Sequence, residues 1–204
     1  MPDWRDAAEI VTRLVDEPLD PYQNILDATA RHRSHHHCKA YPFGDGASLG
    51  VLAAAAAAHR IVECGTALGY TACWLARGSA AARIDTIDFD EQHVRLAREN
   101  IVAAGFGDRV TVHHGAFEDV LPRLASGYDI AFFDGFAPSL QDLDLLASLL
   151  RIGGILISAN LGLSGRETAA YREMICDPEN WMTSLMAEGG RTAVSVKLRT
   201  GKGP

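Results

Sequence analysis

The stretch IVECGTALGYT, from Ile61 to Thr71, constrains the fold of this chain more than any other segment. A short apolar run reaches the acid Glu63, two glycines follow at Gly65 and Gly69, and an apolar helical pattern then resumes. This order predicts a strand, a tight glycine turn and a helix. Because such a turn brings backbone N–H groups close to a ligand, the segment also raises the question of what that ligand is.

The middle of the chain repeats this alternation of strand and helix. The apolar runs lie at 60–64, 83–88, 109–114, 128–133 and 154–158. The helical stretches between them lie at 70–78, 91–104, 117–125 and 140–151. Asp90 and Ser139 are placed to cap two of these helices, and Ser164 with Glu167 predicts a capping box for a further helix near 165–176. Strands that alternate with helices predict βαβ units and a mostly parallel sheet.

The pattern changes after Pro178. The segments WMTSLMA and RTAVSVKL each have the composition of a strand, and Gly189 and Gly190 lie between them, so an antiparallel hairpin is predicted there. The fold class that follows is α/β. We expect a Rossmann-like, doubly wound sheet of seven strands, mostly parallel with a C-terminal antiparallel β-hairpin, with helices on both faces and further helices at the N-terminus.

The N-terminal region is predicted to be helical. Apolar residues at helical spacing indicate an amphipathic helix over 3–15. Asp20 and Pro21 then supply the N-cap and the first-turn proline of a second helix. The breaker cluster YPFGDG at 41–46 precedes a helix of small residues over 47–59.

Length and composition predict one globular domain. The chain has 204 residues, of which 48% are hydrophobic and 22% charged, the balance of an ordinary soluble protein. We expect residues 1–45 to form an N-terminal helical segment and an active-site loop, and residues 46–204 to form the Rossmann-like core. The net charge of -7 argues against a nucleic acid or an anionic membrane as partner, because no general basic field attracts phosphates.

The sequence predicts a cytoplasmic location. The longest apolar run, 51–58, is too short to span a bilayer, and the first residues lack the basic and apolar regions of a signal peptide. The cysteines form no C-x-x-C pair and their spacing indicates no zinc site, so we expect free thiols in a reducing compartment. They are Cys38, Cys64, Cys73 and Cys176.

Asp88 indicates that the ligand of the glycine turn is a nucleoside. It follows Gly69 by 19 positions at the end of the second predicted strand, where a carboxylate can accept both ribose hydroxyls. The plainer alternative is a strand-end acid that is solvated or caps a helix. A nicotinamide dinucleotide requires a middle glycine, which is missing between Gly65 and Gly69. An S-adenosylmethionine turn needs less, because that ligand carries no phosphate there.

The run from Ile61 to Asp134 resembles the catechol and caffeoyl-CoA O-methyltransferase group of class I S-adenosylmethionine-dependent O-methyltransferases. The matching pieces, in order, are VECGTALGYTACWLA, ARIDTIDFDEQHVRLARENIVAAGFGDRVTVHHGAFEDVLPRL and YDIAFFDG. The final AEGGRTAVSVKL resembles the closing hairpin strand of that group. No single motif is diagnostic, but together the pieces cover roughly residues 40 to 200.

The resemblance implies an enzyme that uses S-adenosylmethionine as cofactor and methylates oxygen of a small hydroxylated or aromatic acceptor. It places residues 63–71 on the methionine side, Asp88 on the ribose and residues 116–118 against the adenine, with Phe117 as an apolar wall. A core aromatic is the alternative role for Phe117. The cofactor-binding candidates are Glu63, Gly65, Thr66, Gly69, Tyr70, Thr71, Asp88, Phe89, Gly115, Ala116, Phe117 and Asp134.

The chain departs from the resembled group where that group binds a divalent metal. Asp134 stands in FFDGFA, but the lysine expected three positions later is Ala137, and the expected Asp-Asn pair reads Ala159-Asn160. Asp134 and Asn160 supply one charge and one neutral oxygen, which is little for Mg²⁺. We therefore predict that the usual Mg²⁺ site is absent, and we name no metal-binding residue.

The segment HRSHHHCKAYPFGDG contains the groups that could replace the missing base. The catalytic candidates are Asp134, His37, Lys39 and Tyr41. Three interpretations stay open: a polar helix end without a catalytic role, one histidine or Tyr41 as base, and a metal site that uses two histidines with Asp134. His32 and His36 could share a helix face, which is a weaker indication. His59 and His93 are expected at surface helix positions.

Two other functions stay open on the sequence. A catalytically reduced module that binds S-adenosylmethionine or another nucleoside, as a sensor or scaffold, accounts for Ala137 and Ala159. A nicotinamide-dependent oxidoreductase is disfavoured by the glycine spacing and the terminal hairpin. The partner of an enzyme would be a small-molecule acceptor, which the sequence does not identify. The helix over 3–15 packs either on its own chain or across the two-fold axis of a homodimer.

Overall fold

The computed structural model describes residues 20–199, so the helix expected over 3–15 lies outside the described residues. Within them, the strands and helices follow one another in the predicted order. The strands are β1 (Arg60–Cys64), β2 (Arg83–Asp88), β3 (Val110–His114), β4 (Tyr128–Phe133), β5 (Leu150–Ser158), β6 (Trp181–Ala187) and β7 (Thr192–Lys197).

The seven strands form one sheet in the order β3-β2-β1-β4-β5-β7-β6. Strands β1 to β5 pair in parallel, whereas β7 runs antiparallel to both β5 and β6. The predicted fold class is therefore confirmed. The strand order reverses between β1 and β4, and in open α/β sheets ligands bind outside the carboxyl ends of the strands at such a reversal. The topology thus directs attention to the segments that follow Cys64 and Phe133.

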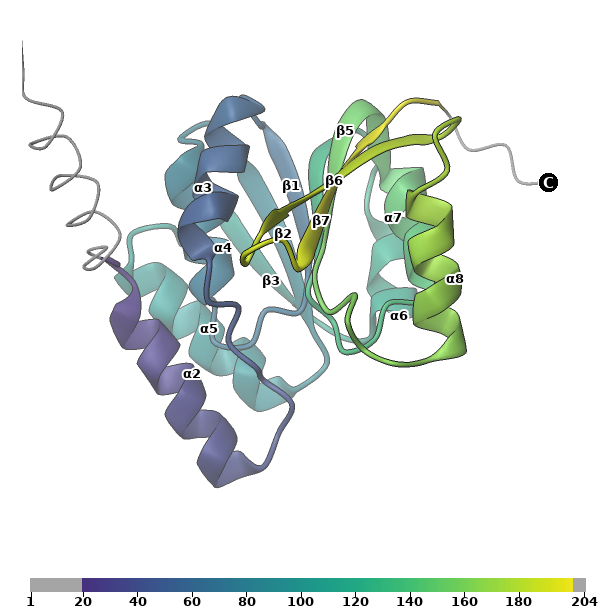
Figure 1. Ribbon diagram of the computed structural model, residues 1–204. Helices are drawn as coiled ribbons and strands as arrows, with labels where there is room; N and C mark the ends of the chain where they lie inside the picture. The colour runs from purple at the N-terminus through teal and green to yellow at the C-terminus, as the bar shows by residue number, and fades with distance from the viewer. Residues whose placement is uncertain (1–19, 200–204) are drawn as a thin grey trace, which may run out of the picture.

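Helices cover both faces of the sheet (Figure 1). One face carries α2 (Gln23–His36), α3 (Gly46–Ala55), α4 (Tyr70–Gly78) and α5 (Glu91–Ala103). The other carries α6 (Phe117–Val120), α7 (Leu140–Leu149) and α8 (Arg166–Ile175), and the short 3-10 helix η1 (Leu121–Arg123) follows α6. Among residues 20–199, no helix combines the length and the apolarity needed to cross a bilayer.

Alternate residues of the central strands belong to two hydrophobic cores. Ile61 and Phe132 are buried in the core shared with α3, α4 and α5, whereas Val62 and Phe133 are buried in the core shared with α7 and α8. Tyr22 and Ile25 extend the first core to the N-terminal segment. Because both faces of the parallel strands are covered, these strands appear in the sequence as continuous apolar runs.

The C-terminal hairpin is fastened to the sheet by a buried cation. The Lys197 ammonium at the end of β7 donates hydrogen bonds to the carbonyl oxygens of Ala147 (2.6 Å) and Leu150 (3.0 Å). Both carbonyls belong to the last turn of α7 or to the residue that follows it, where a positive charge is favourable. This contact holds the last parallel strand, β5, and the hairpin against the same helix end.

Several predicted element ends differ from the structure. Helix α2 begins at Gln23, because the Asp20 carboxylate accepts the Tyr22 N–H within a preceding turn. Strand β5 begins at Leu150, directly after α7, so the helix expected over 140–151 ends at Leu149. The capping box of Ser164 and Glu167 is wrong, since the N-cap of α8 is Gly165 and no side chain caps it. The caps predicted at Asp90 and Ser139 are confirmed.

Candidate functional site

The glycine turn lies at the carboxyl end of β1, beside the end of β4. Gly65 has φ +101°, and a Cβ placed on it would lie 2.5 Å from the carbonyl oxygen of Asp134. The Asp134 N–H in turn donates to the carbonyl oxygen of Cys64 (2.8 Å). Gly69, with φ +90°, is the N-cap of α4. The turn therefore lies in backbone contact with the segment after β4, and only glycine fits at position 65.

The Asp88 carboxylate is held beneath the turn by backbone donors. One oxygen, Oδ2, accepts the Ala67 N–H at 2.8 Å, and Oδ1 accepts the Asp90 N–H at 3.0 Å. The side chain is buried at the carboxyl end of β2. A carboxylate has about four acceptor positions, so capacity remains for hydroxyl donors. This geometry fixes the orientation of the acid that the sequence assigns to a ribose.

The interpretation of His93 as a surface residue is wrong. Its side chain is buried, with Nδ1 3.3 Å from Asp88 Oδ1 and Nε2 3.4 Å from Cys38 Sγ. Burial disfavours the charged ring, but the hydrogen bond and the charge of Asp88 outweigh it and raise the pKa of His93 to about 9. The signal was present in the sequence, because His93 shares the helical stripe of Ala97 and Ile101, which are also buried.

Glu63 is buried at the end of β1. Its Oε2 accepts the hydroxyl of Thr86 (2.5 Å), and Oε1 has no hydrogen-bond partner among the described residues. Burial raises the pKa of Glu63 to about 7, although the hydroxyl groups of Thr71 and Thr86, of which only Thr86 is within hydrogen-bond geometry, oppose the shift. The Thr66 hydroxyl bonds to the Thr86 hydroxyl (2.6 Å), so Thr66 supports the acid from beneath the turn.

Tyr70 connects the glycine turn to the N-terminal segment. Its hydroxyl donates to Asp20 Oδ2 at 2.5 Å, and burial together with this hydrogen bond raises the pKa of the phenol. Tyr70 is the first residue of α4, and Thr71 follows it with a buried side chain. Because its hydroxyl is engaged, Tyr70 ties the start of α2 to the start of α4.

The predicted adenine segment lies at the carboxyl ends of β2 and β3. The Gly115 N–H donates to the carbonyl oxygen of Asp88 (3.0 Å), and Ala116 is the N-cap of α6. The Phe117 ring is half-buried and packs edge-on against Phe133, with centroids 6.0 Å apart. Phe89 is 74% exposed. Phe117 thus has one side in the core, whereas Phe89 leaves an aromatic surface open beside Asp88.

Asp134 follows β4 and is paired with Asn160, which follows β5. The Asn160 amide donates to Asp134 Oδ1 (3.1 Å) and to the carbonyl oxygen of Gly135 (2.6 Å). Desolvation, with the negative charges of Glu63 and Glu188, raises the pKa of Asp134 well above its usual range, although the Asn160 hydrogen bond opposes this. The carboxyl groups of Asp134, Glu63 and Glu188, which come from distant parts of the chain, therefore interact electrostatically at this place.

The segment after α2 passes over this region. Tyr41 lines a small cavity together with Gly65 and Asp134, and the Arg33 guanidinium lies 4.2 Å from the Tyr41 ring centroid. The Lys39 ammonium lies 4.1 Å from the ring centroid of Phe136.

The third candidate of this segment, His37, is placed differently. It is the exposed C-cap residue of α2, with φ +53°, and it does not line the cavity. The structure thus brings Tyr41 to Asp134 and Lys39 to the segment after β4, and it leaves His37 outside.

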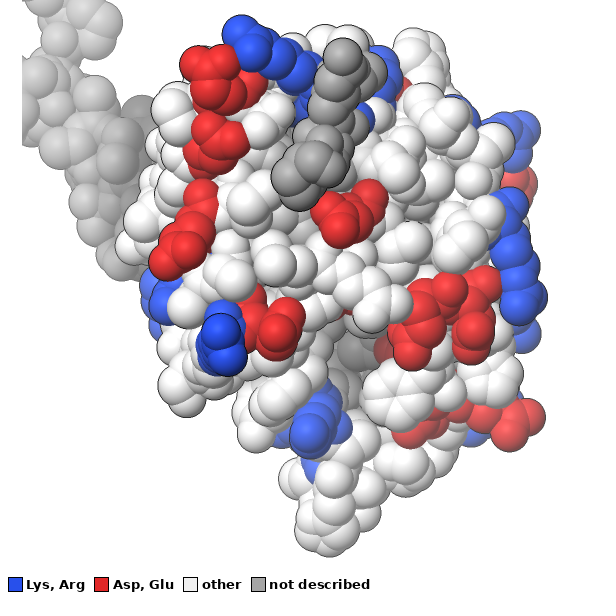
Figure 2. All heavy atoms as spheres, turned by 90° about the vertical axis from the view of Figure 1, so that its right-hand side faces the viewer, with Lys and Arg blue, Asp and Glu red and all other residues white. Residues whose placement is uncertain are grey.

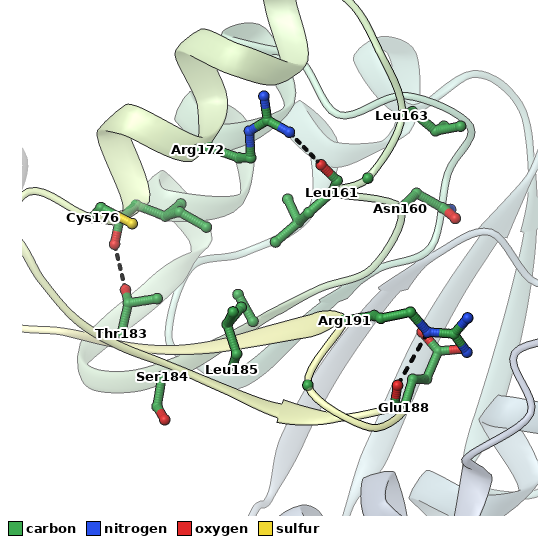
Figure 3. A pocket seen from close by; sticks show the side chains of 14 residues that line it. Asn160, Leu161, Leu163, Arg172, Cys176, Thr183, Ser184, Leu185, Glu188 and Arg191 are labelled. Carbon is green, nitrogen blue, oxygen red and sulfur yellow. Dashed lines mark hydrogen bonds between the residues drawn. The ribbon is translucent and has the colours of Figure 1, made fainter.

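A larger cavity, of about 650 Å³, opens beside Asn160 (Figure 3). Leu161, Ile175 and Leu185 give it apolar walls, and Glu188 and Arg191 of the hairpin turn lie at one end. The sequence analysis missed these residues. They come from the loop after β5, from α8 and from the hairpin, and no motif connects these segments. Acidic and basic side chains are interspersed over the face shown in Figure 2, and no continuous basic patch is visible there.

A family model described as a methyltransferase domain matches residues 62–160. A putative O-methyltransferase of Mycobacterium bovis is 32% identical over 170 residues, which cover 74% of this chain and 75% of that protein. A catechol O-methyltransferase of Mycobacterium tuberculosis is 42% identical over 91 residues, which cover 44% of this chain and 41% of that protein. The match to the first protein is thus the longer, and the match to the second spans less than half of either chain.

A solved structure with the same architecture is that of cofactor-bound Rv0187 from MTB. It superposes with a TM-score of 0.74 at 26% sequence identity, and the alignment covers 92% of this chain and 95% of that one. The similarity therefore extends over nearly the whole chain.

Proposed function

The chain belongs to the family of S-adenosylmethionine-dependent O-methyltransferases, and from that premise we propose that it methylates a small hydroxylated or aromatic acceptor without the usual Mg²⁺ site. The observation that carries the proposal is the Asn160–Asp134 hydrogen bond. Asp134 lines the small cavity at the glycine turn, and Asn160 lines the large cavity. The pair therefore stands between a place for the methyl donor and a place for the acceptor.

The residues around the turn fit the cofactor. We propose that Asp88 accepts the ribose hydroxyls, that Phe89 covers the exposed side of the nucleoside, and that residues 115–117 border the adenine. The orphan Oε1 of Glu63 gives the amino acid part a buried acceptor. When bound, S-adenosylmethionine supplies an electrophilic methyl group on a sulfonium. The chain must then hold the acceptor oxygen in line with that group and manage its proton.

The negative charge of the site favours a cationic donor. Besides burial, the negative charges of Glu63 and Glu188 raise the pKa of Asp134, and only the Asn160 hydrogen bond opposes them. A positive sulfonium relieves this repulsion, whereas the neutral thioether product does not. We therefore propose that Asp134 faces the sulfonium and the acceptor and helps the product to leave.

The Asp134–Asn160 pair does not fit a magnesium site. The amide nitrogen of Asn160 faces both Asp134 and the Gly135 carbonyl, so the amide acts there as a donor and not as a metal ligand. The position of the second family carboxylate is Ala159, whose side chain is buried. Mg²⁺ prefers oxygen ligands in an octahedral shell, and of the two family carboxylate positions only Asp134 still carries a carboxylate. We propose a transfer that does not use this metal.

We propose that Lys39 assists the removal of the proton from the acceptor hydroxyl. The family lysine position is Ala137, and the Lys39 ammonium lies over the ring of Phe136, the residue directly before it. Lys39, which comes from the N-terminal segment, thus lies beside the residue before position 137, where the family has its lysine. An ammonium there stabilises an acceptor oxyanion, and Tyr41 borders the same cavity as Asp134.

A turnover assay tests the proposal. The protein is incubated with S-adenosylmethionine and a panel of catechols and phenols, in EDTA and in Mg²⁺. We expect methyl transfer that is equal in both conditions and that falls in Asp134→Asn. Calorimetry with S-adenosylhomocysteine should show 1:1 binding that Asp88→Ala weakens. Transfer that requires Mg²⁺ would refute the metal-free proposal, and binding without any transfer would favour the catalytically reduced module.

The homodimer and the cytoplasmic location also remain proposals. Strand β6 is the outer strand of the sheet, and its side chains Met182, Leu185 and Met186 are each more than half exposed. An edge strand with exposed apolar side chains supports association with a second copy. Sedimentation of the full chain tests this. The free thiols of Cys64 and Cys73 are buried, which is compatible with a reducing compartment.

A further inference from the structure

A group of metal-ligating side chains lies at the C-terminal end of α2. One ligand atom each of His32, His36 and Cys38 lies within 4.8 Å of those of the other two. The His32 and His36 rings stack at 4.8 Å between centroids, as expected for residues four apart on a helix. His37 takes a left-handed conformation, and Cys38 lies beside the same helix end.

His93 approaches this group from α5. Its Nε2 lies 3.4 Å from the Cys38 sulfur, and its ring centroid lies 5.1 Å from that of His32 and 6.4 Å from that of His36. Helices α2 and α5 lie on the same side of the sheet (Figure 1). Three imidazoles and one thiol therefore converge from two elements whose sequence positions are more than 50 residues apart.

One atom of the group is an unpaired buried nitrogen. His32 Nε2 is buried and has no hydrogen-bond partner among the described residues. A buried polar atom without a partner is unfavourable, so a ligand that pairs with it is favoured. His36 is exposed, and it gives the group a route to solvent.

The group also has the outer partner that metal-bound histidines have. His93 Nδ1 lies 3.3 Å from Asp88 Oδ1, on the opposite side of the ring from the Cys38 contact. A histidine that binds a metal through one nitrogen commonly donates its other N–H to a carboxylate, which fixes the tautomer and the ring. Asp88 provides that carboxylate here.

We propose that His32, His36, Cys38 and His93 bind one zinc ion, or a similar borderline-soft divalent cation, in a tetrahedral site. Nitrogen and thiolate ligands of this number are those that Zn²⁺ prefers, and they do not suit Mg²⁺. Tetrahedral Zn²⁺ ligands lie roughly 3.5 Å apart, so the ligand atoms of His32, His36 and Cys38, now within 4.8 Å of one another, must move closer, and the exposed His36 is free to do so. The spacing of the cysteines indicated no zinc site, since none of them forms a C-x-x-C pair, and His93 was separately expected on the surface.

Zinc and cobalt binding test the proposal on the full chain without any methyl acceptor. Equilibrium dialysis with Zn²⁺ alone should give one ion per chain. Cys38→Ser and His36→Gln should each weaken binding by about 100-fold or more, since even outer-shell partners contribute roughly 10–100-fold. Co²⁺ should give the visible spectrum of a tetrahedral site with a thiolate charge-transfer band, and Cys38→Ser should abolish that band.

Matched control variants distinguish this site from nonspecific metal binding by the run of histidines. His35 is exposed in the same run and has no atom in the group, and Cys176 is an exposed thiol elsewhere. His35→Gln and Cys176→Ser should leave the affinity and the cobalt spectrum unchanged. Equal binding by wild type, Cys38→Ser and His36→Gln would overturn the proposal, as would the absence of a thiolate band. Circular dichroism of each variant checks that it is folded.

The zinc site and the proposed methyl transfer succeed or fail separately. A chain that binds zinc through Cys38 but not S-adenosylhomocysteine supports the site and refutes the function, and the reverse result does the opposite. If both ligands bind, the contact between His93 and Asp88 connects the zinc site with the cofactor site. Titration of one ligand in the presence of the other then measures the coupling between the two sites. Any factor by which zinc changes the affinity for S-adenosylhomocysteine must equal the factor by which S-adenosylhomocysteine changes the affinity for zinc.

Discussion

The side-chain amide of Asn160 donates a hydrogen bond of 3.1 Å to Oδ1 of Asp134. These residues follow neighbouring parallel strands, β4 and β5, whose carboxyl ends lie together at the edge of the sheet that carries the glycine turn. Because the Asn160 amide donates to the carboxylate, this hydrogen bond holds the Asp134 side chain in place. The chemistry of this edge is therefore that of a fixed, poorly solvated carboxylate.

Restoring the second family carboxylate should create a magnesium site. Ala159 is buried, so Ala159→Asp places an acid without a partner beside Asp134 and should destabilise the fold by about 1–3 kcal/mol. Mg²⁺ relieves that repulsion if the two acids can share it. We expect thermal unfolding of Ala159→Asp, but not of wild type, to shift upward with Mg²⁺. Ala80→Asp, at an exposed position, is the control. A shift of equal size in wild type would contradict the proposal of a metal-free site.

The buried acid Glu63 should make the stability of the ligand-free protein fall as the pH rises. Its pKa is raised to about 7 in the folded chain from an ordinary value of 4.5, so the folded state holds a proton that the unfolded state releases. Stability is therefore lost between about pH 4.5 and pH 7, by up to roughly 3 kcal/mol. Glu63→Gln should remove the part of this slope that Glu63 contributes, leave the part due to the raised pKa of His93, and be the more stable protein at pH 8. Denaturant unfolding at pH 5 and pH 8 measures the difference. Glu99→Gln, on the surface of α5, should keep the slope.

The strands were predictable because buried parallel strands are continuous apolar runs, and β1, β2 and β4 match their predicted bounds. The glycine turn and Asp88 were predictable because the order of residues along a short stretch of the sequence determines them. The burial of His93 was missed because a histidine in a helix is usually exposed. The other residues on the same stripe of the helix are apolar. The large cavity was beyond prediction from this sequence. Its walls meet only after α8 and the hairpin pack, and no local pattern specifies that contact.

Gly65→Ala should destabilise the chain through a backbone collision. The added Cβ would lie 2.5 Å from the Asp134 carbonyl oxygen, and φ +101° is unfavourable for alanine. Strain of this kind costs about 1–3 kcal/mol, which lowers the Tm of a chain of this size by roughly 2–10 °C. Scanning calorimetry measures the shift. Gly44→Ala is the control, since nothing lies within 4 Å of its added Cβ. A wild-type Tm for Gly65→Ala would show that the two segments move apart easily.

Removing the Lys39 ammonium should lower turnover more than it lowers cofactor binding. If Lys39 assists the acceptor oxygen, Lys39→Met should reduce kcat by about 10²–10⁴-fold and leave the Kd for S-adenosylhomocysteine nearly unchanged. Lys39→Arg keeps the charge over Phe136 and should retain part of the rate if charge matters more than proton removal. His35→Gln serves as the control in the same segment. An unchanged kcat in Lys39→Met would shift attention to Tyr41, which borders Asp134.

Narrowing the large cavity should weaken the acceptor without affecting the methyl donor. Leu185 and Met186 are neighbours on β6 and are exposed to a similar extent, but of the two only Leu185 lines the cavity. Leu185→Trp should therefore raise the KM of the acceptor by about tenfold, which corresponds to a loss of 1.4 kcal/mol in binding. Met186→Trp adds the same ring at a position that does not line the cavity and should leave that KM unchanged. The Kd for S-adenosylhomocysteine should be equal in both variants, because the glycine turn is at the ends of β1 and β2. Equal KM values in the two variants would mean that the acceptor binds elsewhere, and the small cavity between Tyr41 and Asp134 would then be the place to change next.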